Sequence, residues 1–124
     1  MGDKAKVLII DDEEGIRFSF ERFLSKEGYD VTTAGHYDEA LAAIAQKEFD
    51  LIVADIILGG KTGLDFVREA RARGIKCPVV IITGDPTSES ATDAFKITGV
   101  FDYLSKPVKK EKILEVTRAA LSNK

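Results

Sequence analysis

The chain has 124 residues, of which 44% are hydrophobic and 31% are charged, and its formal net charge is −3. This length and composition are typical of a single globular domain with its own core, and the negative charge argues against nucleic-acid binding by the domain itself. One cysteine, Cys77, excludes an internal disulfide and fits a reducing compartment, and it precedes a predicted strand, where we interpret it as a small core or edge residue.

Short apolar runs alternate with helical patterns from one end of the chain to the other. The predicted elements, in chain order, are a strand at Val7–Ile10, a helix at Glu14–Lys26, a strand at Tyr29–Ala34, a helix at Asp38–Lys47, a strand at Leu51–Ala54, a helix at Leu64–Arg73, a strand at Val79–Ile82, a helix opened by Pro86 and Thr87, a strand at Tyr103–Ser105 and a helix at Lys109–Leu121. Five strand–helix units predict a three-layer α/β sandwich, a (βα)5 fold with right-handed crossovers. We expect one domain over residues 1–124, with a core from about residue 6 to about residue 121. The pattern does not determine strand order, although 2-1-3-4-5 is common for five such units.

Four of the apolar runs end on polar residues. These are Asp11-Asp12, Asp55, Thr83 and Lys106. Runs that are apolar on both faces are typical of buried parallel strands, and residues just past the carboxyl ends of such strands gather in one crevice. We therefore expect three carboxylates, one hydroxyl and one ammonium at a single edge of the sheet. This set suits a magnesium ion and a phosphoryl group.

Asp11 and Asp12 are adjacent carboxylates, which repel each other unless positive charge lies nearby. Mg2+ meets this requirement, because it takes one or two carboxylates and completes its shell with water and phosphate oxygens. The alternative is a helix N-cap with a favourable charge at the N-terminus of the following helix. The metal interpretation is favoured because Asp55 is expected at the neighbouring strand end.

Asp55 lies between two apolar segments, which is an unusual place for a turn. A carboxylate held beside a metal can attack phosphorus and form an aspartyl phosphate, while the surrounding groups position the reactants. The Thr83 hydroxyl and the compact Lys106 cation suit phosphate oxygens. Each of these two residues also has a structural alternative: the threonine as a helix N-cap, and the lysine as a solvated strand end.

Taken together, these motifs resemble the receiver domain of bacterial two-component response regulators, over essentially all of Lys6 to Leu121. The matching motifs are Ile9-Ile10-Asp11-Asp12-Glu13, Asp55 with Gly63 closing its loop, Ile82-Thr83-Gly84 and Tyr103-Leu104-Ser105-Lys106-Pro107. The resemblance implies a flavodoxin-like fold with a parallel sheet in the order 2-1-3-4-5. It also implies a switch driven by phosphorylation.

The resemblance further implies the residues that carry the chemistry. Asp55 would accept a phosphoryl group from a sensor histidine kinase or a phosphotransfer protein, in a reaction that requires Mg2+. Asp12, Asp55 and the backbone carbonyl of Ile57 would bind Mg2+ directly, and Asp11 would act mostly through a bound water. No enzyme activity is expected beyond catalysis of the domain's own phosphorylation and dephosphorylation.

By the same resemblance, Thr83 and Lys106 would hold the phosphoryl oxygens. Tyr103 resembles the aromatic switch residue that turns inward when Thr83 moves, and its alternative is a tyrosine half-buried on an edge strand. The switch would change the surface formed by the fourth helix, fifth strand and fifth helix, which would then control a partner, an output domain or a homodimer. We also expect a cis bond between Lys106 and Pro107.

Some positions depart from the family pattern or modulate it. Receivers usually have a proline four residues after the acceptor aspartate, where this chain has Gly59 followed by Gly60, and we predict a loop that becomes ordered on metal or phosphate binding. Ile57 and Asp85 flank the path of the attacking water, and we expect the first to hinder water and the second to orient it. His36 is expected to cap the second helix or face solvent, and not to bind a ligand.

Other functions are less consistent with the sequence. A flavodoxin-type cofactor carrier needs a loop rich in Ser, Thr and Gly after the first strand, where Asp11-Asp12-Glu13 would repel a phosphate. A phosphatase of the haloacid dehalogenase type needs a second aspartate at the position of Ile57. The remaining alternative is a receiver-like interaction module that works without phosphorylation. Because no apolar stretch has the length of a membrane span and the acidic pair interrupts the first apolar run, we expect a cytoplasmic location without membrane binding.

Overall fold

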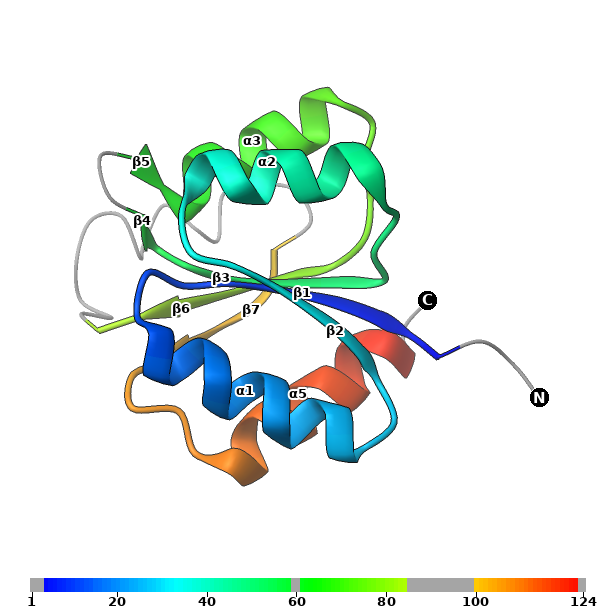
Figure 1. Cartoon of the computed structure of the whole chain (residues 1–124), viewed down its shortest axis with the longest axis vertical. Helices are drawn as coiled ribbons and strands as arrows, with labels where there is room; N and C mark the ends of the chain where they lie inside the picture. Colours follow the sequence, from blue (N-terminus) through cyan, green and yellow to red (C-terminus); the bar gives the residue numbers. More distant parts are fainter. Residues whose placement is uncertain (1–3, 59–60, 85–99, 123–124) are drawn as a thin grey trace.

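The computed structural model describes residues 4–58, 61–84 and 100–122. These residues form a five-stranded parallel sheet between two layers of helices (Figure 1). The helix predicted after Pro86 and Thr87 lies outside the described residues. The elements in chain order are β1 (Lys6–Ile10), α1 (Glu14–Lys26), β2 (Asp30–Ala34), α2 (Tyr37–Gln46), β3 (Leu51–Asp55), β4 (Ile57–Leu58), β5 (Lys61–Thr62), α3 (Gly63–Ala72), β6 (Val79–Thr83), β7 (Val100–Ser105) and α5 (Lys110–Ser122).

The sheet has the strand order β2-β1-β3-β6-β7, which is the predicted order 2-1-3-4-5 for the five main strands. β1 therefore lies directly beside β3, and β6 lies between β3 and β7. Within this register Asp55 is opposite Ile82, and Thr83 is opposite Ser105. Because all five strands are parallel, their carboxyl ends meet at one edge of the sheet, and the polar residues that follow them come together there.

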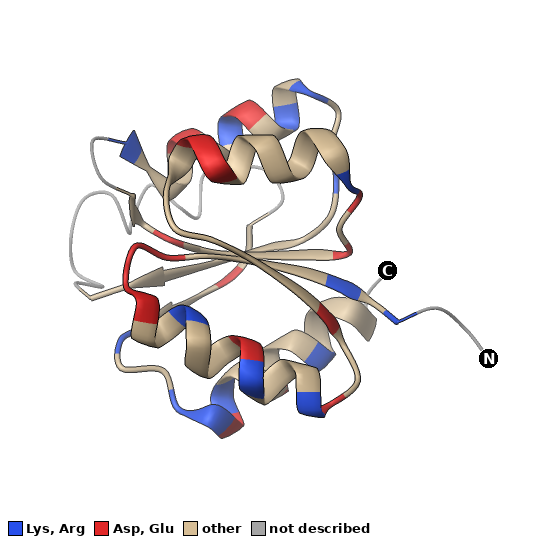
Figure 2. Ribbon diagram, viewed as in Figure 1, with Lys and Arg blue, Asp and Glu red and all other residues tan. Residues whose placement is uncertain are grey.

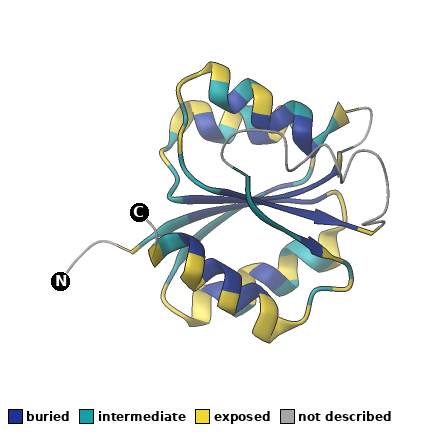
Figure 3. Ribbon diagram, turned by 180° about the vertical axis from the view of Figure 1, so that it is seen from behind, coloured by how far each residue is buried: buried dark blue, intermediate teal, exposed yellow. Residues whose placement is uncertain are grey.

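Helices cover both faces of the sheet. α2 and α3 lie on one face, and α1 and α5 lie on the other (Figure 1). All five residues of β3 and of β6 are buried, as the dark central strands in Figure 3 show. This burial on both faces explains why the apolar runs lack the alternation of a half-exposed strand. No helix in the part of the chain that the structure describes is both long and apolar enough to cross a membrane.

The start of α3 packs tightly behind the end of β3. Thr62 and Asp65 form a capping box, in which the Thr62 hydroxyl accepts from the Asp65 N–H and the Asp65 carboxylate accepts from the Thr62 N–H, both at 3.0 Å. Gly63 begins the helix, and its N–H donates to the carbonyl of Ile56 at 2.8 Å. A Cβ atom on Gly63 would lie 2.3 Å from the carbonyl oxygen of Asp55. Only glycine therefore fits this close approach of the helix to the strand end.

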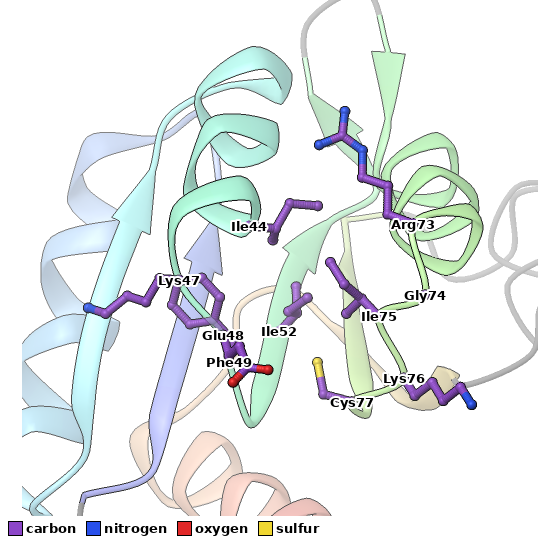
Figure 4. Close-up of a pocket in the computed structure, with 10 residues that line it drawn as sticks. All are labelled: Ile44, Lys47, Glu48, Phe49, Ile52, Arg73, Gly74, Ile75, Lys76 and Cys77. Carbon is purple, nitrogen blue, oxygen red and sulfur yellow. The ribbon is translucent and has the colours of Figure 1, made fainter.

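The opposite edge of the sheet, where the parallel strands begin, has a pocket lined by both apolar and charged residues. A cavity of about 290 Å3 lies there beside the ends of α2 and α3, and its lining includes Phe49, Ile52 and Ile75 (Figure 4). Cys77 is a half-buried free cysteine in this lining, as predicted for a core or edge residue. Both ends of the described chain also lie at this edge, because β1 starts there and α5 runs back to it (Figure 1).

Candidate functional site

An acidic cluster occupies the carboxyl edge of the sheet. Asp11 and Asp55 are buried, with exposed fractions of 1% and 4%, whereas Asp12 and Glu13 are exposed. One carboxylate oxygen from each of these four residues lies within 4.8 Å of the others. Figure 2 shows part of this concentration of acidic residues where β1 leads into α1. The predicted convergence of the two buried aspartates is therefore present in the fold.

Lys106 brings a positive charge into this cluster. Its Nζ donates to Oδ2 of Asp55 at 2.8 Å and to Oε1 of Glu13 at 2.9 Å, and it lies 3.4 Å from Oδ2 of Asp11. Burial alone lowers the pKa of an ammonium, but the hydrogen bonds to Asp55 and Glu13 outweigh burial and raise the pKa of Lys106 above its ordinary value. The lysine is therefore a fixed cation at the acidic edge. The bond between Lys106 and Pro107 is cis, as predicted.

Asp11 is less well compensated than Asp55. Its Oδ1 accepts from the Glu13 N–H at 2.9 Å, but among the described residues its buried Oδ2 makes no hydrogen bond and has only the 3.4 Å ion pair with Lys106. Burial, with a smaller contribution from the Asp55 charge, raises the pKa of Asp11 to about 6, while the Glu13 N–H and Lys106 oppose this shift. A buried carboxylate oxygen without a hydrogen bond, beside three more carboxylates, belongs to a set of oxygen ligands that fits a hard divalent cation.

The other predicted site residues lie around this cluster. Thr83 is buried at the end of β6, and its backbone carbonyl accepts from the Lys106 N–H at 2.7 Å. Ile57 is 63% exposed, and its N–H donates to Oδ1 of Asp55 at 3.2 Å. Tyr103 is half-buried in β7 and packs against the hydrophobic cluster beneath α2 and α3. The structure thus places Thr83 and Ile57 beside Asp55, while Tyr103 belongs to the neighbouring core.

Three predictions about loops have different outcomes. Gly59, Gly60 and Asp85 lie outside the described residues, so the proposals about loop ordering and water orientation stay predictions. His36 caps α2, because its Nδ1 accepts from the Glu39 N–H at 3.3 Å. The prediction of a capping histidine is therefore confirmed.

Two contacts at the site were not among the sequence predictions. Glu13 pairs with Lys106, and Arg17 donates from Nη1 to the backbone carbonyl of Asp11 at 2.7 Å. The only sequence signal for Glu13 was a third acidic residue at a position where short capping side chains are preferred. Arg17 had no such signal, since its contact depends on how the first turn of α1 folds back over the end of β1.

The chain belongs to the response regulator receiver domain family, because a model of that family matches residues 7–118. Among curated relatives, it is 33% identical over 117 residues to the DNA-binding transcriptional regulator NtrC of Salmonella typhimurium, covering 94% of this chain and 25% of that protein. The chain spans about a quarter of the length of NtrC and of several similar relatives.

Solved structures agree with this assignment. The receiver domain of NtrX from Brucella abortus has a TM-score of 0.86 and 35% identity, covering 95% of this chain and 99% of that chain. The response regulator TrrA from Thermotoga maritima, solved in complex with Mg2+-BeF, has a TM-score of 0.82 and 26% identity, covering 94% of this chain and 99% of that chain. Receiver domains bind Mg2+ at an acidic pocket, and this chain has an acidic cluster at the carboxyl edge of its sheet.

Proposed function

We propose that this domain accepts a phosphoryl group on Asp55, in a reaction that requires Mg2+, and that phosphorylation switches its affinity for a partner. The observation that carries this proposal is the surroundings of the Asp55 carboxylate. It is buried at the end of β3, receives hydrogen bonds from Lys106 and the Ile57 N–H, and lies among three further acidic side chains. The phosphodonor would be a sensor histidine kinase or a phosphotransfer protein.

The donor set fits Mg2+, for which oxygen ligands are preferred. Asp12, Asp55 and the backbone carbonyl of Ile57 would hold the ion, and Asp11 would contact it mostly through water. The buried Oδ2 of Asp11, which makes no hydrogen bond among the described residues, supports this assignment. When bound, the cation neutralises negative charge on the phosphoryl oxygens.

Asp55 acts as the nucleophile. A carboxylate oxygen forms a bond to phosphorus while the bond between phosphorus and the donor's imidazole nitrogen breaks, and the electron pair of that bond stays on the nitrogen. Asp55 begins as a carboxylate, so no proton has to leave it. Lys106 and Thr83 would bind the phosphoryl oxygens, because the ammonium and the hydroxyl are donors held on the strand ends beside Asp55.

The output would be a change in binding. Phosphorylation can shift a two-state element only if the phosphoryl group interacts differently with the two states, and the pair of Thr83 and Tyr103 is the element that we propose. The responding surface would comprise β7, α5 and the helix predicted after Pro86 and Thr87, whose residues lie outside the described part of the chain. It would contact a partner, an output domain or a second copy. The single cysteine supports action in the reducing cytoplasm.

The proposal is tested by intact mass spectrometry after incubation with acetyl phosphate, with and without Mg2+. We expect a Mg2+-dependent gain of one phosphoryl group, and we expect the Asp55→Asn variant to show none. Absence of any gain in the wild-type protein would refute the proposal and favour an interaction module that works without phosphorylation.

A further inference from the structure

Glu13 is placed to cap α1 but contacts the reactive edge instead. It is the N-cap residue of α1, with φ −93° and ψ 116°, and its side chain makes no capping hydrogen bond. N-cap positions favour Ser, Thr, Asp and Asn, whose short side chains reach the N–H groups of the first turn. The longer Glu13 side chain places Oε1 2.9 Å from Nζ of Lys106, a residue 93 positions away.

Glu13 occupies a hydrogen-bond donor of Lys106, the cation that would bind a phosphoryl oxygen. An ammonium has three donors, and Lys106 directs two of them to Asp55 and Glu13. A phosphoryl oxygen that binds Lys106 must compete with these carboxylates. Asp55 becomes part of the acyl phosphate, and Lys106 pairs with Asp11 only at 3.4 Å, so Glu13 is the remaining carboxylate that holds a donor of Lys106 in a hydrogen bond. The Glu13 side chain is 60% exposed and that of Lys106 is 19% exposed. Because exposed ion pairs are weak, separating Glu13 from Lys106 costs a small but nonzero free energy.

We propose that Glu13 is a positioning residue that holds Lys106 in the unphosphorylated domain and thereby slows phosphorylation of Asp55. The inference rests on the proposed function, because it concerns the same reaction. Glu13 takes no part in bond formation or cleavage and acts only through Lys106. Its carboxylate also lies within 4.8 Å of carboxylate oxygens of Asp11, Asp12 and Asp55, so it adds negative charge where an anionic donor must approach.

Glu13→Gln tests this inference, because it removes the charge and keeps the length of the side chain. The measurement is the initial rate of phosphorylation by acetyl phosphate at saturating Mg2+, followed by intact mass. An exposed ion pair of this kind predicts a rate about two- to fivefold above that of the wild type. Glu14→Gln is the matched control: this neighbouring residue is also exposed, and it forms no ion pair within the described part of the chain. Its rate should stay within about 1.5-fold of the wild-type rate, since exposed charges without a close partner act weakly.

Glu13→Asp separates the tether from the charge. Aspartate keeps the charge, but its shorter side chain is suited to capping α1 and should no longer reach Lys106. The inference predicts that Glu13→Asp also accelerates phosphorylation, and that the gain of Glu13→Gln over the wild type shrinks in about 1 M salt, where exposed pairs are screened. A purely structural role would change the melting temperature without this salt dependence.

The outcomes distinguish this inference from the proposed function. If the wild-type protein is phosphorylated and Glu13→Gln is not faster, or if Glu13→Asp keeps the wild-type rate, the tether is refuted and the phosphoacceptor role of Asp55 stands. If the wild-type protein gains no phosphoryl group in any condition, the proposed function fails, and the inference about Glu13 fails with it.

Discussion

Replacing Gly63 with alanine should push the start of α3 away from Asp55. The new Cβ would lie 2.3 Å from the Asp55 carbonyl oxygen, and contacts below 3.0 Å are essentially never seen, so the two backbones must separate by at least 0.7 Å. The neighbouring atoms are also backbone, with the Asp55 carbonyl carbon at 3.1 Å and Cα of Ile56 at 3.3 Å. No flexible side chain can move aside to relieve this clash. Overpacking of this kind destabilises by about 1–3 kcal/mol or more.

The Gly63→Ala prediction is checked by thermal unfolding and by the acetyl phosphate assay. We expect the melting temperature to fall by about 4–15 °C, and phosphorylation of Asp55 to slow by about tenfold to a hundredfold, since a displacement approaching 1 Å misplaces a reacting group. Gly15→Ala is the control, because this exposed helical glycine has open space around its Cβ position. That variant should be more stable by about 0.5–1 kcal/mol and should react at the wild-type rate. Wild-type stability and rate in Gly63→Ala would refute the reasoning from close packing.

Three other predictions concern buried polar groups and the metal. Thr117→Val should raise the free energy of unfolding, measured by urea denaturation, by about 1 kcal/mol, because the buried Thr117 hydroxyl has no hydrogen-bond partner among the described residues. A lower free energy of unfolding in this variant would contradict the prediction. In EDTA, the unfolding free energy should fall by up to about 3 kcal/mol as the pH rises from about 4 to about 6. The reason is that the pKa of Asp11 is about 6 in the folded state and 3.8 ordinarily, so the folded state binds the proton more tightly than the unfolded state does. Asp11→Asn should remove this part of the pH profile, and an unchanged slope would disprove the assignment. Mg2+ at about 100 times its Kd should stabilise the wild type by about 2.7 kcal/mol, and Asp12→Asn should shift that response to higher Mg2+ concentrations, as melting curves would show.

The fold was predictable because both faces of the central strands are covered. Apolar runs without alternation indicate such strands, and their alternation with helices restricts the topology. Helix ends were less predictable, because side-chain caps decide them. The predicted helix Glu14–Lys26 has the same bounds as α1. The helix predicted at Asp38–Lys47 is shifted by one residue from α2, because His36 caps α2 and the helix therefore starts at Tyr37. The two-residue strands β4 and β5 are too short to show a period in the sequence.

At the candidate site, convergence was predictable and side-chain pairing was not. Parallel strands bring Asp11, Asp55 and Lys106 to one edge whatever their rotamers. The pairing of Glu13 with Lys106 depends on the reach of two long side chains, from residues that are 93 positions apart in the sequence. The contact from Arg17 to the carbonyl of Asp11 depends on the geometry of a turn. The pattern of residue types along the sequence indicates neither how far a side chain reaches nor the geometry of a turn.

The placement of the two described ends has a practical consequence for building tools from this domain. β1 starts and α5 finishes at the edge of the sheet opposite the acidic cluster (Figure 1). A fluorescent protein, an affinity tag or a surface linker attached at either end would leave the reactive edge facing solvent. The domain can therefore be immobilised or labelled there while a large phosphodonor protein still has access to Asp55.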